Sequence, residues 1–364
     1  MKLSEIISVI ESFAPLAYQE AYDNAGLLLG SENMEIKKAL ITIDVTEEVI
    51  NEAINVKANL IISHHPVIFN EIKKITGKTY TERIIIKAIK DNMAIYAAHT
   101  NLDNVMEGVN YKICQKLDLD NLRILSPVKG ELRKIVTFVP LDHADKVRLA
   151  IFNAGAGQIG NYEQCSYNLE GFGTFKGSEE TNPYAGEKGK LHIEKEIRIE
   201  TIFPKAIQQK VVSAMIAAHP YEEVAYDIYP LDNSYANAGM GMIGELEKDT
   251  NELTFLKKIK SVFDIKTLKH TKLRNKNIKK VAVCGGSGSF LIKDAISVDA
   301  DIFITGDIKY HQFFDAYDNI LIADVGHYES EQFTKEIFYE LLKKKLPKFA
   351  LHLSKVKTNP INYL

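Results

Sequence analysis

A chain of 364 residues, 46% hydrophobic and 26% charged, has the composition of a globular protein, and its length favours two domains over one core. The formal net charge of −3 argues against a dedicated nucleic-acid-binding protein, and we interpret the basic segment 266–280 as a solvated surface. Three cysteines far apart in sequence fit a reducing compartment, and no apolar run is long enough to span a membrane, so we expect a cytoplasmic protein without a membrane partner.

The first part of the chain alternates predicted helices and strands. An amphipathic helix is predicted at residues 3–13, because its apolar residues recur at helical spacing, and its acidic residues distinguish it from a signal peptide. Predicted strands follow at 39–45, 59–62 and 94–98. Predicted helices lie between them at 46–56, with Thr46 as the N-cap, and at 81–91. This alternation favours a largely parallel sheet covered by helices.

From about residue 130 the pattern changes, and after about residue 235 the first pattern resumes. The middle segment contains predicted strands at 134–140, 194–202 and 224–230, and predicted helices at 144–153 and 205–218. Their order indicates an α+β module of the βαββαβ, ferredoxin-like kind, with an exposed loop at 177–189. The last segment contains predicted strands at 281–283, 302–305, 320–323 and 349–353, and predicted helices ending at 298 and spanning 328–345.

The simplest architecture is therefore a split α/β domain with an inserted second domain. Residues 1–129 and 233–364 form the α/β domain, and residues 130–232 form the insert.

Histidines and carboxylates follow the ends of four predicted strands. They are His64 and His65, His99 and Asp103, Asp307 and His311, and His327 and Glu331. In open α/β sheets, functional groups gather where strands end and loops begin. A single histidine is usually a surface or core residue, but several histidines and carboxylates at successive strand ends indicate one shared site.

The spacing of five of these residues predicts a two-metal site. His64 and His65 are adjacent, so they can serve one site if the strand has ended before them, or else reach two different ions. Asp103 can bridge two cations because a carboxylate offers two oxygens. His327 and Glu331 share a helix face at i and i+4, whereas Glu329 points elsewhere. Histidines mixed with carboxylates suit Zn, Mn or Fe better than Ca or Mg.

Three further motifs admit two interpretations each. Gly285–Ser289 follows a strand and is either a tight turn or an anion site formed by backbone N–H groups. Asp23 and Asn24 form an Asx turn or contact the site or its substrate. His219–Glu223 is a helix-to-strand turn or a ligand contact, and we favour the turn.

Several segments together resemble the Nif-three-like family, whose members often carry the description GTP cyclohydrolase I type 2 homologue. The matching segments are Tyr22–Leu27, Ser63–Pro66, His99–Asp103, Gly285–Ser289, Thr305–Asp307 with His311, and Gly326–Glu331. The resemblance covers both α/β segments. The insert resembles an extra module of some bacterial members, which is similar to PII and CutA proteins.

This resemblance implies a dinuclear metal centre and a defined assembly. The implied ligands of two divalent ions are His64, His65, Asp103, His327 and Glu331. The implied assembly is a ring-shaped homohexamer whose sites face an internal cavity.

Three functions fit these observations. The first is a metal-dependent hydrolase of a nucleotide or related heterocycle, with GTP ring opening as the narrower version and His99, Asp307 or His311 carrying protons. The second is a non-catalytic metal or ligand sensor, in which the insert binds a small ligand. The third is a scaffold for proteins or nucleic acid, which only the 266–280 segment supports.

Overall fold

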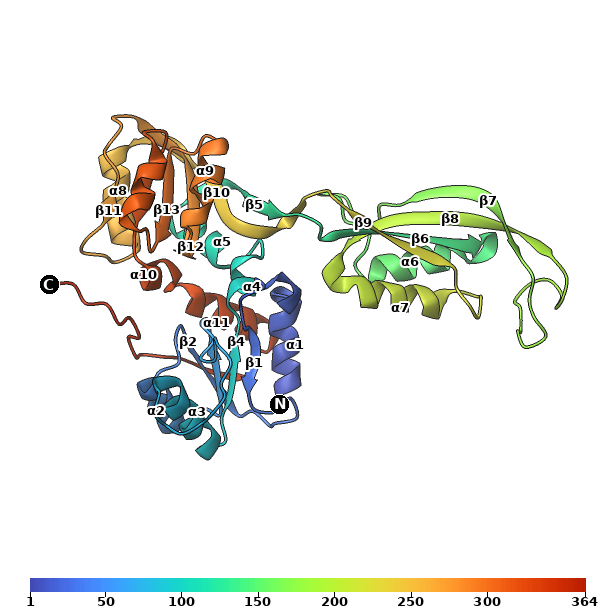
Figure 1. The fold of residues 1–364 in the computed structure, drawn as a ribbon, viewed down its shortest axis with the longest axis horizontal. Helices are drawn as coiled ribbons and strands as arrows, with labels where there is room; N and C mark the ends of the chain where they lie inside the picture. The colour runs from blue at the N-terminus through green and yellow to red at the C-terminus, as the bar shows by residue number, and fades with distance from the viewer. The chain divides into compact units, whose positions relative to one another are not determined.

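The computed structural model describes residues 1–364 and divides into two compact units (Figure 1). One unit combines Met1–Pro127 with Ala236–Leu364, and the other is Val128–Tyr235. No helix in either unit has the length and apolarity needed to cross a bilayer.

The first sheet of the larger unit is a mostly parallel sheet between two helical layers. Its strands, in spatial order, are β1 (Gly26–Leu29), β4 (Ala94–Ala97), β3 (Leu60–Ser63), β2 (Lys38–Thr42) and β15 (Ala350–Leu353). Only β1 runs antiparallel to its neighbour. Helices α2 (Glu47–Asn55) and α3 (Tyr80–Lys90) cover one face, and α1 (Leu3–Phe13) lies on the other with α11 (Thr334–Lys345). Thr46 caps α2 as predicted, because its side chain accepts a hydrogen bond from Val49 N.

The second sheet of this unit has a parallel centre with antiparallel edges. Its strands, in spatial order, are β11 (Lys269–His270), β14 (Leu321–Asp324), β13 (Ile302–Gly306), β12 (Asn277–Ser287), β10 (Tyr235–Asn251) and β5 (Leu119–Val128). Strands β12, β13 and β14 are parallel. Helix α8 (Glu252–Val262) packs on one face and α9 (Ile292–Ser297) on the other.

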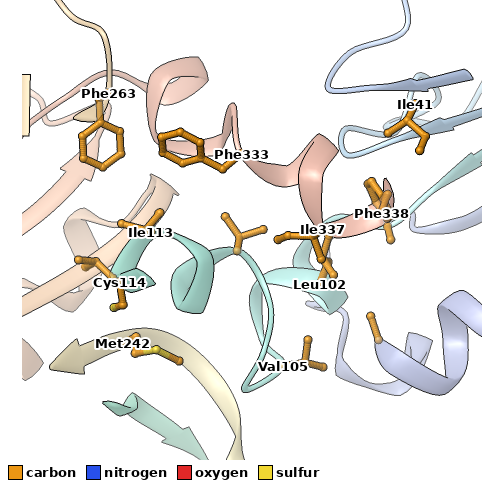
Figure 2. Packing of buried hydrophobic residues seen from close by; sticks show 14 of the residues in the cluster. Ile41, Leu102, Val105, Ile113, Cys114, Met242, Phe263, Phe333, Ile337 and Phe338 are labelled. Carbon is orange, nitrogen blue, oxygen red and sulfur yellow. The ribbon is translucent and has the colours of Figure 1, made fainter. Parts of the chain in front are cut away.

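A single hydrophobic cluster joins the two sheets of the larger unit. It includes Ile41 of β2, Leu102 and Ile113 from the segment after β4, and Phe263 and Phe333 from the second half of the chain (Figure 2). Residues far apart in sequence therefore share one core, and the carboxyl ends of β3, β4, β13 and β14 are held in one rigid framework.

The smaller unit is an antiparallel four-stranded sheet with the predicted βαββαβ order. Its strands, in spatial order, are β7 (Tyr167–Phe175), β8 (His192–Pro204), β6 (Leu132–Pro140) and β9 (Tyr226–Leu231). Helices α6 (Ala144–Asn153) and α7 (Gln208–Ala218) pack on one face of this sheet against Ile135 and Ile199. The order of strands and helices confirms the predicted ferredoxin-like module.

Two predicted elements differ from the structure. The predicted helix at 328–345 is two helices, α10 (His327–Glu331) and α11. The chain turns between them because Phe333 packs its ring 5.7 Å from that of Phe263, while Gln332 donates to Phe263 O at 2.9 Å. The predicted loop at Gly285–Ser289 begins inside β12, which continues to Ser287.

Candidate metal centre

Two adjacent histidines reach the same region because β3 ends before them. Strand β3 stops at Ser63, and the backbone N–H groups of His64 and His65 both donate to Ile43 O, at 3.1 and 3.0 Å. The strict alternation of strand side chains therefore no longer applies. The short helix α10 carries His327 and Glu331 on one face, as their spacing predicts.

These side chains form two groups that share one carboxylate. In the first group, His64 Nε2 lies 3.6 Å from Glu331 Oε1 and 3.7 Å from Asp103 Oδ1. In the second, Glu331 Oε2 lies 2.9 Å from His65 Nε2 and 3.2 Å from His327 Nε2. Asp103 can bridge two cations in principle, but in this structure the carboxylate common to both groups is that of Glu331. Glu331 is buried between the groups and directs one oxygen to each.

The outward ring nitrogen of each of these histidines is held by an acceptor. His64 Nδ1 lies 2.9 Å from Ala98 O, His65 Nδ1 lies 2.7 Å from Asp44 Oδ1, and His327 Nδ1 lies 2.6 Å from Asp307 Oδ2. In a neutral imidazole such contacts place the proton on Nδ1 and leave the Nε2 lone pair facing inward. This is the arrangement that holds metal-binding imidazoles in proteins.

Three of the inward-facing atoms are buried without a hydrogen bond. They are His64 Nε2, Asp103 Oδ1 and Glu331 Oε2, the last of which lies against His65 Nε2 and His327 Nε2 without hydrogen-bond geometry. His65 Nε2 and His327 Nε2 lie only 3.3 Å apart. Buried acceptors that converge in this way are unfavourable unless a cation or a proton lies between them. The three histidines and two carboxylates therefore fit a pair of metal ions.

The pKa values show how the groups share protons when no cation is present. Burial lowers the pKa of His65, but the carboxylates of Asp44 and Glu331 beside it outweigh burial and raise that pKa to about 10. Burial also lowers the pKa of His327, but Glu331 and Asp307 outweigh it and raise that pKa to about 9. Burial also opposes the shift of Glu331, whose pKa falls well below its usual value because His64, His65 and His327 surround it. Protons thus take the place that a cation would occupy.

His99 adds a fourth imidazole beside these groups. Its ring centre lies 5.3 Å from those of both His64 and His65, and the ligand atoms of the three cluster together. His99 Nδ1 lies 2.8 Å from Asp23 Oδ1, and Thr100 N donates to Asp23 Oδ2 at 3.0 Å. Burial raises the pKa of Asp23, but these hydrogen bonds prevail and lower it to about 2. Asp23 is therefore a charged anchor for His99, and it also accepts a local hydrogen bond from Asn24 N at 2.7 Å, so features of both predicted interpretations are present.

Comparison with known proteins assigns the chain to a family. The model of the family described as Duf34/NIF3 (NGG1p interacting factor 3) matches residues 1–360. The chain belongs to the Duf34/NIF3 family. It is 42% identical to the "GTP cyclohydrolase 1 type 2 homolog" of Halalkalibacterium halodurans, over 99% of this chain and 98% of that one. The protein of the same description from Bacillus subtilis is 39% identical, with the same coverage.

A solved structure in this family has the same fold. The crystal structure of a Bacillus cereus protein related to NIF3 superposes with a TM-score of 0.86 at 41% identity, over 100% of this chain and 99% of that one.

In this NIF3-family chain, Asp307 and His311 occupy different positions from those expected of proton carriers. Asp307 contacts the Nδ1 side of His327, away from the inward-facing nitrogens, so it orients the ring. His311 is exposed, and its ring contacts Tyr310 and Phe314. It belongs neither to the two groups that share Glu331 nor to the cluster of His64, His65 and His99.

The glycine-rich segment at the end of β12 packs closely and does not cradle an anion. Gly285 N donates to Asn110 Oδ1, Gly286 N to Ser330 Oγ, and Gly288 N to Thr305 Oγ1, at 2.8–2.9 Å. These donors are already used. Gly286 has a φ of +61°, and a Cβ there would collide with Glu331 Oε1. This glycine therefore makes room for the shared carboxylate.

Sequence reasoning missed Asp44 because the predicted strand 39–45 enclosed it. In the structure β2 ends at Thr42, so Asp44 follows the end of the strand next to β3 and holds His65. With the strand end placed correctly, the rule that selected the other strand-end residues would have included it. The remaining motifs behave as expected: Glu329 accepts from Asn359 Nδ2 at 2.9 Å, and His219 bonds Phe138 O and Tyr221 N in a turn after α7.

Proposed function

We propose that this chain is a dinuclear metal-dependent hydrolase that acts on a nucleotide or a related heterocycle. The observation that carries the proposal is the position of Glu331, whose two oxygens face two separate groups of converging ligand atoms, three of which are buried without a hydrogen bond. The nitrogen and carboxylate donors favour Zn, Fe or Mn. When bound, two such ions would polarise a substrate oxygen and lower the pKa of a water held between them.

The exposure of the ligands supports catalysis over a purely structural role. His64 is fully buried, whereas the side chains of His65, Asp103 and His327 are 23%, 21% and 35% exposed. One side of the centre is therefore open to solvent. Structural metal sites are closed, and catalytic ones keep a position for water or substrate.

The Asp23–His99 pair is suited to moving a proton at this open centre. Asp23 accepts from Nδ1 of His99, so His99 Nε2 is free to take or give a proton. A buried carboxylate behind an imidazole also stabilises the imidazolium that forms when the ring accepts a proton. We assign general acid/base catalysis to His99 and a positioning role to Asp23 and Asp307.

Two exposed aromatic rings beside His99 support a planar substrate. Phe69 lies with its ring centre 6.3 Å from that of His99 and 6.5 Å from that of Tyr22. Tyr22 is 65% exposed and Phe69 46% exposed. Exposed aromatic faces next to a polar centre can stack on a heterocycle. The descriptions of the relatives as GTP cyclohydrolase homologues agree with such a substrate.

A matched pair of variants on one helix tests the proposal. The protein is loaded with Zn, Fe or Mn and incubated with GTP, other nucleotides and phosphoesters, and products are followed by chromatography. We expect turnover by the native chain and by Glu329→Gln, and none by Glu331→Gln. Glu329 is also a buried carboxylate of α10, but it faces Asn359. No turnover by any metal form of the native chain, or equal turnover by both variants, would refute the proposal.

Self-assembly remains a prediction that a separate experiment addresses. We propose a homohexamer, with a small molecule as substrate and neither nucleic acid nor a membrane as a partner. Native mass spectrometry of the metal-loaded protein should give six times the 41.0 kDa chain mass. A monomer at micromolar concentration would contradict the assembly without affecting the metal centre.

A further inference from the structure

The smaller unit contains a cavity that has no part in the metal centre. Its volume is about 560 Å³, which lies within the usual range for small-molecule sites. Strand residues Phe138, Glu196 and Arg198 line its floor, and Tyr184 and Tyr221 line its wall. Glu196 and Arg198 alternate along β8 with residues that pack against the helices, so the cavity lies on the opposite face of the sheet.

Two glycines of β7 create the hollow. Gly171 pairs with Glu196 across the strands, and Gly173 lies two residues further along on the same face. A Cβ at Gly173 would collide with the Glu196 carboxylate, whereas a Cβ at Gly171 would meet nothing within 4 Å. The missing side chains leave the Glu196 carboxylate facing open space.

The wall of the cavity is aromatic. The ring of Tyr221 lies with its centre 6.0 Å from that of Tyr184 and 5.8 Å from that of Phe175. The Tyr221 hydroxyl donates to Glu196 Oε1 at 2.7 Å. Burial and the nearby Glu196 raise the pKa of Tyr221 far above its usual value, so the phenol remains a neutral donor. These contacts hold the three rings together along the lining of the cavity.

The charge of Glu196 is not compensated by the protein. Glu196 is only 6% exposed, and no lysine, arginine or histidine forms an ion pair with it. Two neighbouring charges are paired elsewhere: Arg198 with Glu200 at 2.7 Å, although its Nε is buried without a partner, and Glu170 with Lys195 at 2.8 Å. A buried carboxylate without a cation is unfavourable, and a positively charged ligand would remove that cost.

We propose that the smaller unit binds a small organic cation with a flat apolar body. Glu196 accepts hydrogen bonds from the cationic N–H groups, and the rings of Tyr184, Tyr221 and Phe175 contact the body and attract its charge. Phosphate-bearing ligands are disfavoured, because their charge would face the same carboxylate. The inference is independent of the proposed hydrolase activity.

Three probes of nearly the same shape test the charge requirement on the full chain. They are benzamidine, which is cationic, benzamide, which is neutral, and benzoate, which is anionic. Binding is measured by calorimetry and by saturation-transfer NMR. We expect saturable binding of benzamidine, binding of benzamide weaker by about tenfold, and no binding of benzoate. Equal binding of the three probes, or no saturable binding of benzamidine, would overturn the proposal.

Three variants locate the site. Glu196→Gln keeps an acceptor for Tyr221 but removes the charge, and it should weaken benzamidine binding by about tenfold. Gly171→Leu should abolish binding, because a Cβ at this position meets nothing within 4 Å and the larger side chain would occupy the cavity. Glu163→Gln makes the same charge change at an exposed position outside the cavity, and it should bind as the native chain does. Unchanged binding in both cavity variants, with native circular dichroism, would refute the assignment.

Discussion

Replacing one glycine should displace the carboxylate on which the whole metal centre depends. A Cβ at Gly286 would overlap Glu331 Oε1 and lie 3.3 Å from its Cδ. A relaxed contact between carbon and oxygen is about 3.3 Å, so Oε1 must retreat by about 1 Å. Metal–ligand distances tolerate shifts of only about 0.2 Å. Gly286→Ala should therefore weaken binding of both ions, because both groups share Glu331, by at least about 10–100-fold.

A second glycine separates this displacement from backbone strain. Gly160 has a φ of +57°, close to the +61° of Gly286, but a Cβ there meets nothing within 4 Å. Alanine at either position costs about 1–2 kcal/mol in the left-handed region. Metal content after dialysis, measured by plasma mass spectrometry, and competition calorimetry should show loss only in Gly286→Ala. Two ions bound with native affinity in that variant would refute the shared role of Glu331.

Three other predictions follow from the contacts around the centre. Asp44→Asn should weaken metal binding about 10–100-fold, because His65 is no longer held in place. Asp23→Asn should keep both ions but lose turnover, because His99 is no longer oriented. Loss of metal in the Asp23 variant would instead identify His99 as a ligand. Metal binding at pH 7 should release at least two protons, because the pKa values of His65 and His327 in the metal-free chain are about 10 and 9. Metal affinity should then rise about 100-fold per pH unit, and calorimetry in buffers of different ionisation enthalpy would count the released protons. Folding raises the pKa values of both histidines, so their protonation stabilises the metal-free chain. This stabilisation is complete below about pH 6.5 and is lost as the pH rises through about 9 to 10. The melting temperature of the metal-free chain should therefore fall in that range, while that of the metal-loaded chain stays constant.

Local sequence patterns determine much of the fold but not the elements that depend on distant partners. Residues 3–13 and 144–153 are helices with the predicted bounds, because their apolar spacing and ends suffice. Strand β7 was missed because Gly171 and Gly173 have low strand propensity, and pairing with β8 supplies its register. No Gly or Pro marks the break between α10 and α11. The packing of Phe333 on Phe263 produces this break, so the local sequence does not indicate it.

The ligand groups were predictable in membership but not in arrangement. Strand ends indicated where chemistry gathers, and the structure brings the five expected side chains together, although metal binding by them stays a prediction. Which carboxylate is shared depends on where α10 lies relative to β3, and no local pattern states that. The separate position of His311 likewise follows from the short helical segment Tyr310–Ala316, which turns it to solvent.

Three carboxylates in this chain lie against a glycine, and the comparison shows which feature marks a ligand site. A Cβ at Gly286, Gly173 or Gly326 would collide with Glu331, Glu196 or Glu329, respectively. The close approach alone is therefore not diagnostic. Asn359 donates to Glu329, which closes that site with a neutral side chain of the same chain. Glu331 has a buried oxygen without a hydrogen bond, and Glu196 has a phenol but no cation. Glycine supplies the space. A buried carboxylate that only protonated imidazoles or a phenol satisfy indicates that each of these two sites takes a cation: metal ions at Glu331 and an organic cation at Glu196.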